Sequence, residues 1–539
     1  MTMLKTSSES FPASKKIMSD IPYVLRVEFR DLARDVKKIT GKPVACYKCG
    51  GYLLSVDQIE DDPKVGKHFV CAFCGTLNVI EGEVIVAGYD TDFVVTPPPD
   101  KTGTTTDMIA AGGRSFLALI DVSGSMAGAN LAAVKRSLNT SIDSLAANSP
   151  DTLFGLIEFE STVLSRNMET GEAIELPVDS FHSLDMIMDS AKKLLDRIRM
   201  VPVGKNSAKL KKHVKALRDQ GGTALGPAVG MAYILAKHRN VDRVVLLTDG
   251  LANEGIGALE GYQVTPASKY YENMGHMYRE IGTALDVVGI ASISGMELKT
   301  LGLLPEATGG QMYYVKPNEL DRSLADLAGA SLLGRDVEVK LITPLGVKIK
   351  DASGVSRAVI EDFRKRSEGK IGVVGENHEL YFQIEPEGEL KVEEIPVQVQ
   401  VTYTNEEGAR RVRAVTTMLK VAKKEAELFE TLEPTVGATF VTQKAGEDAF
   451  RGDRARGKSR ITAFRAALKK RAGDAPKSVQ SKLNTVESAL ASEEAEMERQ
   501  ELQMQEVSET APSAAADEVS TLNLAQMKRS SKDLFEDEE

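Results

Sequence analysis

The pattern of apolar and polar residues changes its period along this chain of 539 residues. Between residues 112 and 332, short apolar runs at 116–120, 244–247 and 285–290 alternate with segments such as 131–145, in which apolar residues recur at helical spacing. The short runs predict buried parallel strands, and the segments between them predict crossover helices. We therefore expect residues 112–332 to form a doubly wound α/β domain with a mostly parallel sheet.

A period of two replaces this pattern in residues 335–420. Apolar and polar residues alternate in 337–341 and 397–403, and turns rich in Gly, Pro and Asn separate such runs. Strict alternation predicts strands with one face buried. The region is expected to form an antiparallel β-sandwich, which can share strands with residues 21–40 and 77–95.

The two ends of the chain have a different composition from the middle. Residues 1–20 are polar and rich in serine, so we expect them to be disordered. Residues 421–490 have helical spacing and predict a helical region. Residues 491–539 are acidic and rich in Glu, Gln, Ser and Ala, a composition that cannot bury a core, and they predict a disordered acidic tail.

Four cysteines form two pairs with the same spacing. Cys46 and Cys49, and later Cys71 and Cys74, each follow the pattern Cys-x-x-Cys-Gly. Two such turns can place four thiolates around one ion, which favours a tetrahedral Zn²⁺ site. Disulfides are the alternative, and the intracellular setting expected below disfavours them. Residues 21–100 are therefore expected to form a zinc ribbon with flanking β-strands.

Oxygen-bearing side chains follow the ends of two predicted parallel strands. The run 116–120 ends at Asp121, and Ser123 and Ser125 follow in a glycine-bearing turn. The run 244–247 ends in Thr248 and Asp249, and a glycine-rich loop between the two strands contains Thr223. Hard oxygen ligands at the carboxyl edge of a parallel sheet suit Mg²⁺ or Mn²⁺ better than a soft metal.

These five residues, Asp121, Ser123, Ser125, Thr223 and Asp249, resemble the complete metal-ion-dependent adhesion site (MIDAS) of von Willebrand factor A (VWA) domains. The resemblance implies direct bonds to the ion from the two serines, with Thr223 as a further ligand. It implies that Asp121 and Asp249 act mainly through water. One coordination position would then be left for an Asp or Glu of a partner protein.

The order of the predicted parts is similar to that of another family. A zinc ribbon, a VWA domain, a β-sandwich and a helical region follow one another in the inner-coat subunits of COPII vesicles, which this layout resembles. The resemblance implies a component of vesicle transport, and it predicts that the ribbon, sandwich and helices pack together.

Composition excludes several classes of function. The formal net charge of −11 disfavours general binding to nucleic acid. No apolar run reaches the roughly 18 residues of a transmembrane helix, so only peripheral membrane association stays open. The N-terminus lacks the apolar core of a signal peptide, and we expect an intracellular, cytoplasmic protein.

Enzymatic chemistry is not predicted. Asp121 and Asp249 are assigned to the metal, none of the six histidines lies in the three site loops, and the chain has no phosphate-binding loop motif. The sequence therefore predicts an interaction scaffold that binds an acidic partner residue through Mg²⁺. The alternatives are a COPII-like coat component, an adaptor for an AAA+ ATPase machine or, as an enzyme, a metal-dependent phosphatase-like hydrolase.

Overall fold

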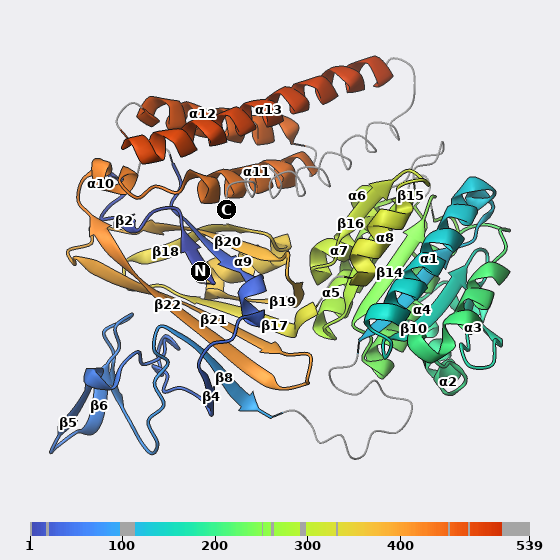
Figure 1. The fold of residues 1–539 in the computed structure, drawn as a ribbon, viewed down its shortest axis with the longest axis horizontal. Coiled ribbons are helices and arrows are strands. Elements are labelled where there is room, and N and C mark those ends of the chain that lie inside the picture. The colour runs from blue at the N-terminus through green and yellow to red at the C-terminus, as the bar shows by residue number, and fades with distance from the viewer. Residues whose placement is uncertain are drawn as a thin grey trace.

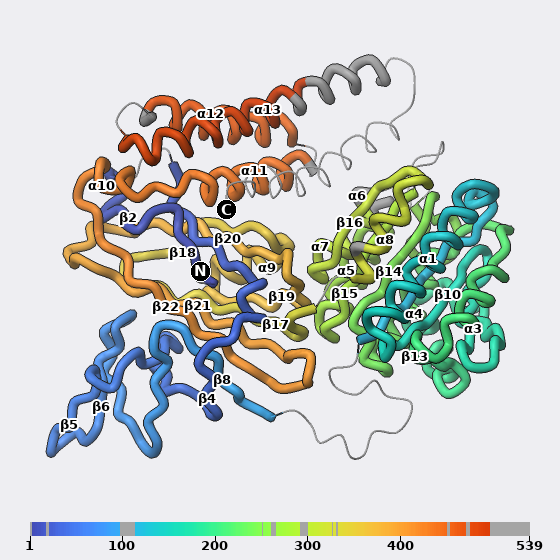
Figure 2. The backbone as a smooth tube through the Cα atoms, viewed as in Figure 1, coloured from blue at the N-terminus to red at the C-terminus, as the bar shows by residue number. Residues whose placement is uncertain are grey.

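A computed structural model of the chain describes residues 3–17, 21–97, 114–250, 252–259, 264–290, 298–329, 332–450, 453–472 and 475–508. Figure 1 shows an α/β block at one end, a β-sandwich in the middle, a layer of helices along one side of the sandwich, and a small sheet at its far corner. The small sheet has three strands. The backbone trace in Figure 2 shows that the N-terminal segment, in blue, lies among sandwich strands from much later in the chain.

The α/β block is built on a mostly parallel sheet with the strand order β12-β11-β10-β9-β14-β15-β16. Its parallel strands are β9 (Ser115–Asp121), β10 (Leu153–Phe159), β14 (Arg243–Thr248), β15 (Ala284–Ile290) and β16 (Met312–Val315), and its antiparallel strands are β11 (Val163–Arg166), β12 (Ala173–Leu176) and β13 (Val201–Pro202). The central strands β9, β14 and β15 are buried along their whole length, as continuous apolar runs require.

Helices cover both faces of this sheet, which confirms the doubly wound fold. The helices are α1 (Ala129–Asn148), α2 (Leu184–Leu194), α3 (Val203–Ala216), α4 (Leu225–Arg239), α5 (Val264–Glu280), α6 (Leu298–Leu301), α7 (Leu303–Thr308) and α8 (Leu320–Gly329). One core contains side chains of α4 and α5, and the other contains those of α1, α3 and α8. Alternate residues of the central strands point into one core or the other.

The resemblance to VWA domains also predicts a last strand over 306–315 and a closing helix over 320–333, and both boundaries are wrong. The segment expected to be a single strand over 306–315 divides into α7 and β16, separated by Gly309 and Gly310. Gly309 has a left-handed backbone (φ 75°), and a Cβ on Gly310 would overlap with the carbonyl oxygen of Leu285. The closing helix ends at Gly329, and Leu332 and Leu333, which were expected to belong to it, already lie in the next strand.

The sandwich consists of two sheets. One has the order β1-β3-β20-β18, and the other has the order β19-β17-β21-β22-β8-β4 with β2 also paired to β22. The strands are β1 (Leu4–Thr6), β2 (Ser10–Pro12), β3 (Val24–Glu28), β4 (Lys38–Thr40), β8 (Asp90–Thr96), β17 (Leu332–Ile342), β18 (Val347–Ser353), β19 (Glu368–Gly375), β20 (Glu379–Pro386), β21 (Glu394–Thr404) and β22 (Arg410–Ala422). Strands from before the α/β block therefore complete the sandwich that follows it.

The expected disorder of residues 1–20 is wrong for the part that the structure describes. β1 pairs with β3, and β2 runs parallel to β22. Met3 and Phe11 are fully buried in the sandwich core. The serines that made this segment polar act as hydrogen-bonding groups, for example Ser8, whose Oγ donates to the carbonyl oxygen of Leu428 (2.9 Å). A few apolar residues at suitable positions are enough to anchor it.

The remaining helices form two layers: the first three contact the sandwich, and the last two pack on the third (Figure 1). They are α9 (Arg357–Arg366), α10 (Glu425–Phe429), α11 (Pro434–Phe450), α12 (Arg454–Ala472) and α13 (Lys477–Ser508). α13 continues well past residue 490, where the disordered tail was expected to begin, because acidic residues of the predicted tail pair with basic residues of α12. Lys458 Nζ lies 2.9 Å from Glu498 Oε1, and Arg465 pairs with Glu494. The rest of the predicted tail, 509–539, lies outside the described residues.

No helix in the described parts of the chain is both long and apolar enough to cross a membrane.

Candidate metal centres

The first candidate site lies at the carboxyl edge of the α/β sheet. Asp121 ends β9 and Thr248 ends β14, with Asp249 directly after it. β9 and β14 are parallel neighbours, with Ile120 paired to Leu247, so both strands end at the same edge. This is where open α/β sheets bind their ligands.

Hydrogen bonds connect four of the five predicted ligands. The Ser123 N–H donates to Asp121 Oδ1 (2.8 Å), and the hydroxyl oxygens of Ser123 and Ser125 are 3.0 Å apart. The Ser125 hydroxyl donates to Asp249 Oδ1 (2.8 Å). The structure therefore brings Asp121, Ser123, Ser125 and Asp249 into one cluster.

Thr223 reaches the same edge through its backbone. The Gly124 N–H, in the turn that carries the two serines, donates to the carbonyl oxygen of Gly221 (3.1 Å). On the other side, the Thr223 N–H donates to Asn253 Oδ1 (2.8 Å), and the Asn253 N–H donates back to the Thr223 carbonyl oxygen (3.1 Å). The Thr223 loop is thus held between the serine turn and the loop that follows Asp249.

Burial is uneven across this cluster. Asp121 and Asp249 are 0% exposed, whereas Ser125 is exposed. Burial raises the pKa of the Asp121 carboxyl to about 6, although bonds from Ser123 and Thr248 favour its charged form. The nearby Asp249 carboxylate contributes to this increase of the pKa. Two buried carboxylates so close together are costly unless a cation or a proton neutralises them.

The donor set fits a hard divalent cation. All the donor atoms are hydroxyl or carboxylate oxygens, the ligands that Mg²⁺ and Mn²⁺ prefer. Neighbouring ligands in an octahedron with bonds of ~2.1 Å are about 3 Å apart. The hydroxyl oxygens of Ser123 and Ser125 have this separation, 3.0 Å.

Sequence reasoning missed two residues that orient the carboxylates. The Thr248 hydroxyl donates to Asp121 Oδ2 (2.5 Å), and the Asn130 side-chain amide donates to Asp249 Oδ2 (2.6 Å). The position of Thr248 at a strand end was a usable signal. Asn130 lies in the first turn of α1, and nothing in its sequence context distinguishes it from a surface asparagine.

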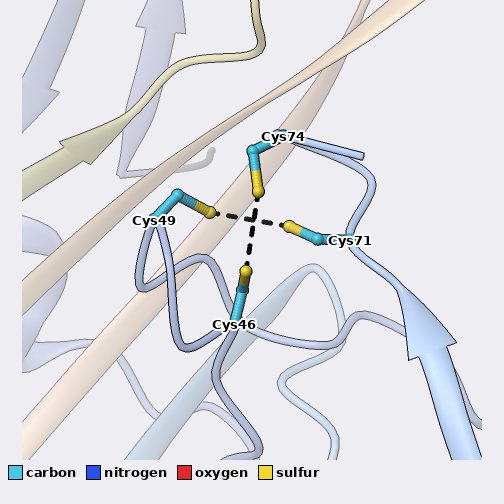
Figure 3. A group of neighbouring side chains, drawn as sticks. All are labelled: Cys46, Cys49, Cys71 and Cys74. Atoms are coloured by element: carbon cyan, nitrogen blue, oxygen red, sulfur yellow. Dashed lines mark hydrogen bonds between the residues drawn. The ribbon is translucent and has the colours of Figure 1, made fainter. Parts of the chain in front are cut away.

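The second candidate site is formed by the four cysteines (Figure 3). Cys46 Sγ and Cys74 Sγ are 3.5 Å apart, as are Cys49 Sγ and Cys71 Sγ, and all four sulfurs lie within 4.8 Å of one another. A disulfide would need a separation of about 2 Å, so the disulfide alternative is not the arrangement in this structure. Sulfurs around a tetrahedral Zn²⁺ lie about 3.8 Å apart. The cluster can therefore bind zinc.

Glycines make the two cysteine turns possible. Gly50 and Gly75, which follow the two pairs, have φ angles of 77° and 68° and donate to the carbonyl oxygens of Cys46 and Cys71 (both 2.9 Å). A residue with a side chain is strained in this left-handed conformation. The pattern Cys-x-x-Cys-Gly therefore reflects the need for a left-handed glycine as well as the spacing of the two ligands.

The thiols differ in how readily they ionise. Burial alone raises the pKa of Cys46, but the backbone N–H groups of Cys49 and Lys48, with Asn78 and Cys74, favour its thiolate and lower the pKa to about 6. Burial raises the pKa of Cys71 to about 11. A bound cation would compensate for the cost of ionising the buried thiols.

Both cysteine turns are attached to the sandwich. The Gln400 side chain donates to the carbonyl oxygen of Gly50 (2.8 Å), and the Tyr52 N–H donates to Gln398 Oε1 (2.9 Å). At the second turn, the Leu345 N–H donates to the carbonyl oxygen of Phe73 (2.9 Å). The ribbon is therefore docked on the sandwich at two points.

Comparison with known proteins agrees with this architecture. Residues 114–326 match the family model of the Sec23/Sec24 trunk domain. The crystal structure of the human COPII-coat protein Sec24c superposes with a TM-score of 0.66 at 16% identity, covering 90% of this chain and 70% of that chain. The predicted resemblance to a VWA domain with a zinc ribbon, in a layout like that of COPII inner-coat subunits, is confirmed at the level of the fold.

Other relatives are more distant or are matched only in part. A von Willebrand factor type A structure from Catenulispora acidiphila has a TM-score of 0.46 at 16% identity, covering 70% of this chain and 82% of that chain. Circularly permutated Ras protein 1 of Dictyostelium discoideum is 25% identical over 464 residues, which is 79% of this chain. The chain spans 54% of the length of that relative.

Proposed function

We propose that this chain is a non-enzymatic, cytosolic protein-interaction scaffold of the COPII inner-coat type, and that its α/β domain binds an acidic residue of a partner protein through Mg²⁺. The metal would be held by Asp121, Ser123, Ser125, Thr223 and Asp249. One observation carries the proposal: two carboxylates of the cluster are completely buried, while Ser125 at its outer side is exposed. An ion there would have protein ligands on one side and solvent on the other.

Each residue of the cluster has a defined part in this recognition. Thr248 and Asn130 hold the two buried carboxylates in place, and the serines offer neutral hydroxyl oxygens toward the ion. A bound Mg²⁺ supplies Lewis acidity for a carboxylate ligand. Truncating one partner of a buried charged pair at an interface costs roughly 2–5 kcal/mol, so this single contact would set specificity within a larger interface.

The same bonds argue against a hydrolase. A general base must be free to accept a proton from water. Asp121 accepts hydrogen bonds from Ser123 and Thr248. Asp249 accepts hydrogen bonds from Ser125 and Asn130. These bonds fix the orientation of both carboxylates. The adaptor role beside an AAA+ ATPase stays a prediction from the sequence.

The scaffold part of the proposal rests on the extent of the structural match. The superposition covers 90% of the chain. In this chain the ribbon, the α/β domain, the sandwich and the helices are joined in one arrangement (Figure 1). Such an arrangement serves assembly, because it presents large, rigidly connected surfaces. We infer coat-like partners and a peripheral association with membranes from this likeness.

The test is affinity capture of partners with the wild type and with the double variant Ser123→Ala/Ser125→Ala, each with Mg²⁺ and with chelator. Partners bound through the metal are expected to be lost in both the variant and the chelator arms. The matched control is Ser481→Ala/Ser488→Ala, two exposed serines on α13, which should retain every partner. An unchanged set of partners in the first variant would remove the site from the mechanism.

A further inference from the structure

A stripe of exposed aliphatic side chains lies on the small sheet of the ribbon, which consists of β5 (Ile59–Asp62), β6 (Gly66–Val70) and β7 (Leu77–Val79). Val70 is 51% exposed, Leu77 45% and Val79 56%. The register places Val70 opposite Leu77 and His68 opposite Val79, and directly opposed residues point to the same face of a sheet. The three aliphatic side chains therefore form one continuous exposed patch, a feature typical of protein interaction sites.

The strand β7 also has an open hydrogen-bonding edge, on the side that faces away from β6. Bonds from the Cys71 N–H to the Thr76 carbonyl (2.9 Å) and from the Ile80 N–H to the Lys67 carbonyl (2.8 Å) fix the phase of the β6–β7 ladder. Because bonded and non-bonded pairs alternate, the backbone groups of Leu77 and Val79 point away from β6. Within the described residues, no backbone bond outside the ladder reaches Leu77 or Val79.

Two other edge strands of the molecule, β18 and β12, carry charges or a register shift that β7 lacks. β18 has Lys348 and Lys350 and a register shift next to Ile349, and β12 carries the exposed Glu175. Charges and bulges of this kind prevent a foreign strand from pairing with an edge. β7 has the sequence Leu-Asn-Val, with no charge, no proline and no register shift in its pairing with β6. Its edge is therefore open to an added strand.

Acidic residues surround the patch. The chain leaves β7 through the exposed Glu81 and Glu83, and the exposed Glu60 lies across His68 on the same face. These carboxylates would attract a basic segment and repel an anionic lipid surface. The negative charge around the patch therefore favours a basic peptide over an anionic membrane surface as the ligand.

We propose that the β7 edge is a docking site for an extended segment of a partner protein that carries aliphatic residues at alternate positions and Lys or Arg at its ends. The segment adds a strand to the sheet. Its backbone pairs with Leu77 and Val79, its aliphatic side chains pack on the patch, and its basic residues lie near the surrounding carboxylates. Main-chain bonds supply affinity and the alternate side chains supply specificity in this mode of recognition. The site is independent of the metal cluster of the α/β domain.

The probe is a fluorescent synthetic peptide with the sequence Lys-Lys-Val-Ser-Val-Lys-Lys, titrated with the zinc-loaded full-length protein and followed by anisotropy. Val79→Lys places a charge on the edge and should weaken binding by at least about tenfold. The matched control Val56→Lys changes a valine that is 58% exposed and lies outside the sheet, and it should bind as the wild type does. A peptide with Glu in place of Lys should also bind at least about tenfold more weakly.

A second measurement leaves the protein unaltered. Methylating alternate backbone nitrogens of the peptide removes the donors that face β7, and binding should be lost. Equal binding of the methylated peptide, or equal binding by Val79→Lys with its zinc content intact, overturns the proposal. If Val79→Lys loses zinc, the methylated peptide decides alone.

Two further results would assign the patch to another occupant and so overturn the proposal. One is a wild-type dimer in sedimentation experiments that Val79→Lys makes monomeric. The other is binding to phosphatidylcholine/phosphatidylserine vesicles that Val79→Lys abolishes.

Discussion

The cysteine cluster and the oxygen cluster differ in how far apart their ligands lie in the chain and in how open they are. The four cysteines come from two neighbouring turns, and each turn forms its own backbone geometry with a glycine. The oxygen cluster joins Asp121 to Asp249 across more than a hundred residues, and its outer serine is exposed. A local, closed set of ligands suits a structural ion, whereas a distant, open set suits recognition. Disrupting each cluster should therefore have different consequences.

The largest effect is expected from Cys71→Ser. Structural zinc sites contribute on the order of 10 kcal/mol to folding, so the ribbon should lose its fold. Hydrogen exchange over residues 44–80 and the zinc content measure this loss. Ser125→Ala serves as the control and should leave both unchanged. A ribbon that stays protected in Cys71→Ser would contradict a structural role for the cluster.

Asp121→Ala should affect the other centre alone. It removes a buried carboxylate, and we expect the affinity for Mn²⁺, measured by electron paramagnetic resonance, to fall by about a hundredfold. Zinc content and exchange in the ribbon should stay at wild-type values. Loss of zinc in this variant would show that the two centres are coupled, contrary to the comparison above.

Gly226→Ala tests how tightly α4 packs against the loop that follows Asp249. A Cβ on Gly226 would overlap with the carbonyl oxygen of Ile256, which is backbone and cannot swing aside. We expect a loss of about 2 kcal/mol in the free energy of unfolding, measured by denaturant titration. Gly222→Ala is the comparison: its Cβ would meet the flexible side chain of Glu254, and the cost should be much smaller.

Asn130→Ala should weaken Mn²⁺ binding by about tenfold, because Asp249 loses a donor that orients it. Calorimetric titration measures the change. Asn148→Ala, an exposed asparagine on the same helix, is the control and should bind as the wild type does. Equal affinities for the two variants would mean that the bond to Asp249 does not orient the ligand.

The smallest effect is expected from Gln400→Ala at the junction between ribbon and sandwich. The carbonyl oxygen of Gly50 loses its donor, which should cost about 1 kcal/mol. Faster hydrogen exchange around Gly50, with zinc retained, is the expected signature. Met418→Ala, at an exposed position on β22, is the control. Unchanged exchange would show that the other docking contacts suffice.

Local patterns predicted much of this molecule. Continuous apolar runs identified β9 and β14, and alternation identified β21. The cysteine pairs with their glycines identified the ribbon, because the information for each turn lies within five residues. The disorder expected for residues 1–20 was wrong. Composition gives no information on where Met3 and Phe11 pack, and both are buried in the core of the sandwich, whose other strands come mostly from later in the chain.

The sequence by itself determined which residues can ligate a cation and which strand ends carry them, because side-chain chemistry and hydrophobic period are local properties. Only the tertiary structure decided that Asn130 holds Asp249, that the first strands complete the sandwich beyond the α/β domain, and that β7 keeps an open edge. Such contacts depend on which distant segments pack together, and packing is set by the burial of the whole chain, which no short stretch of sequence records.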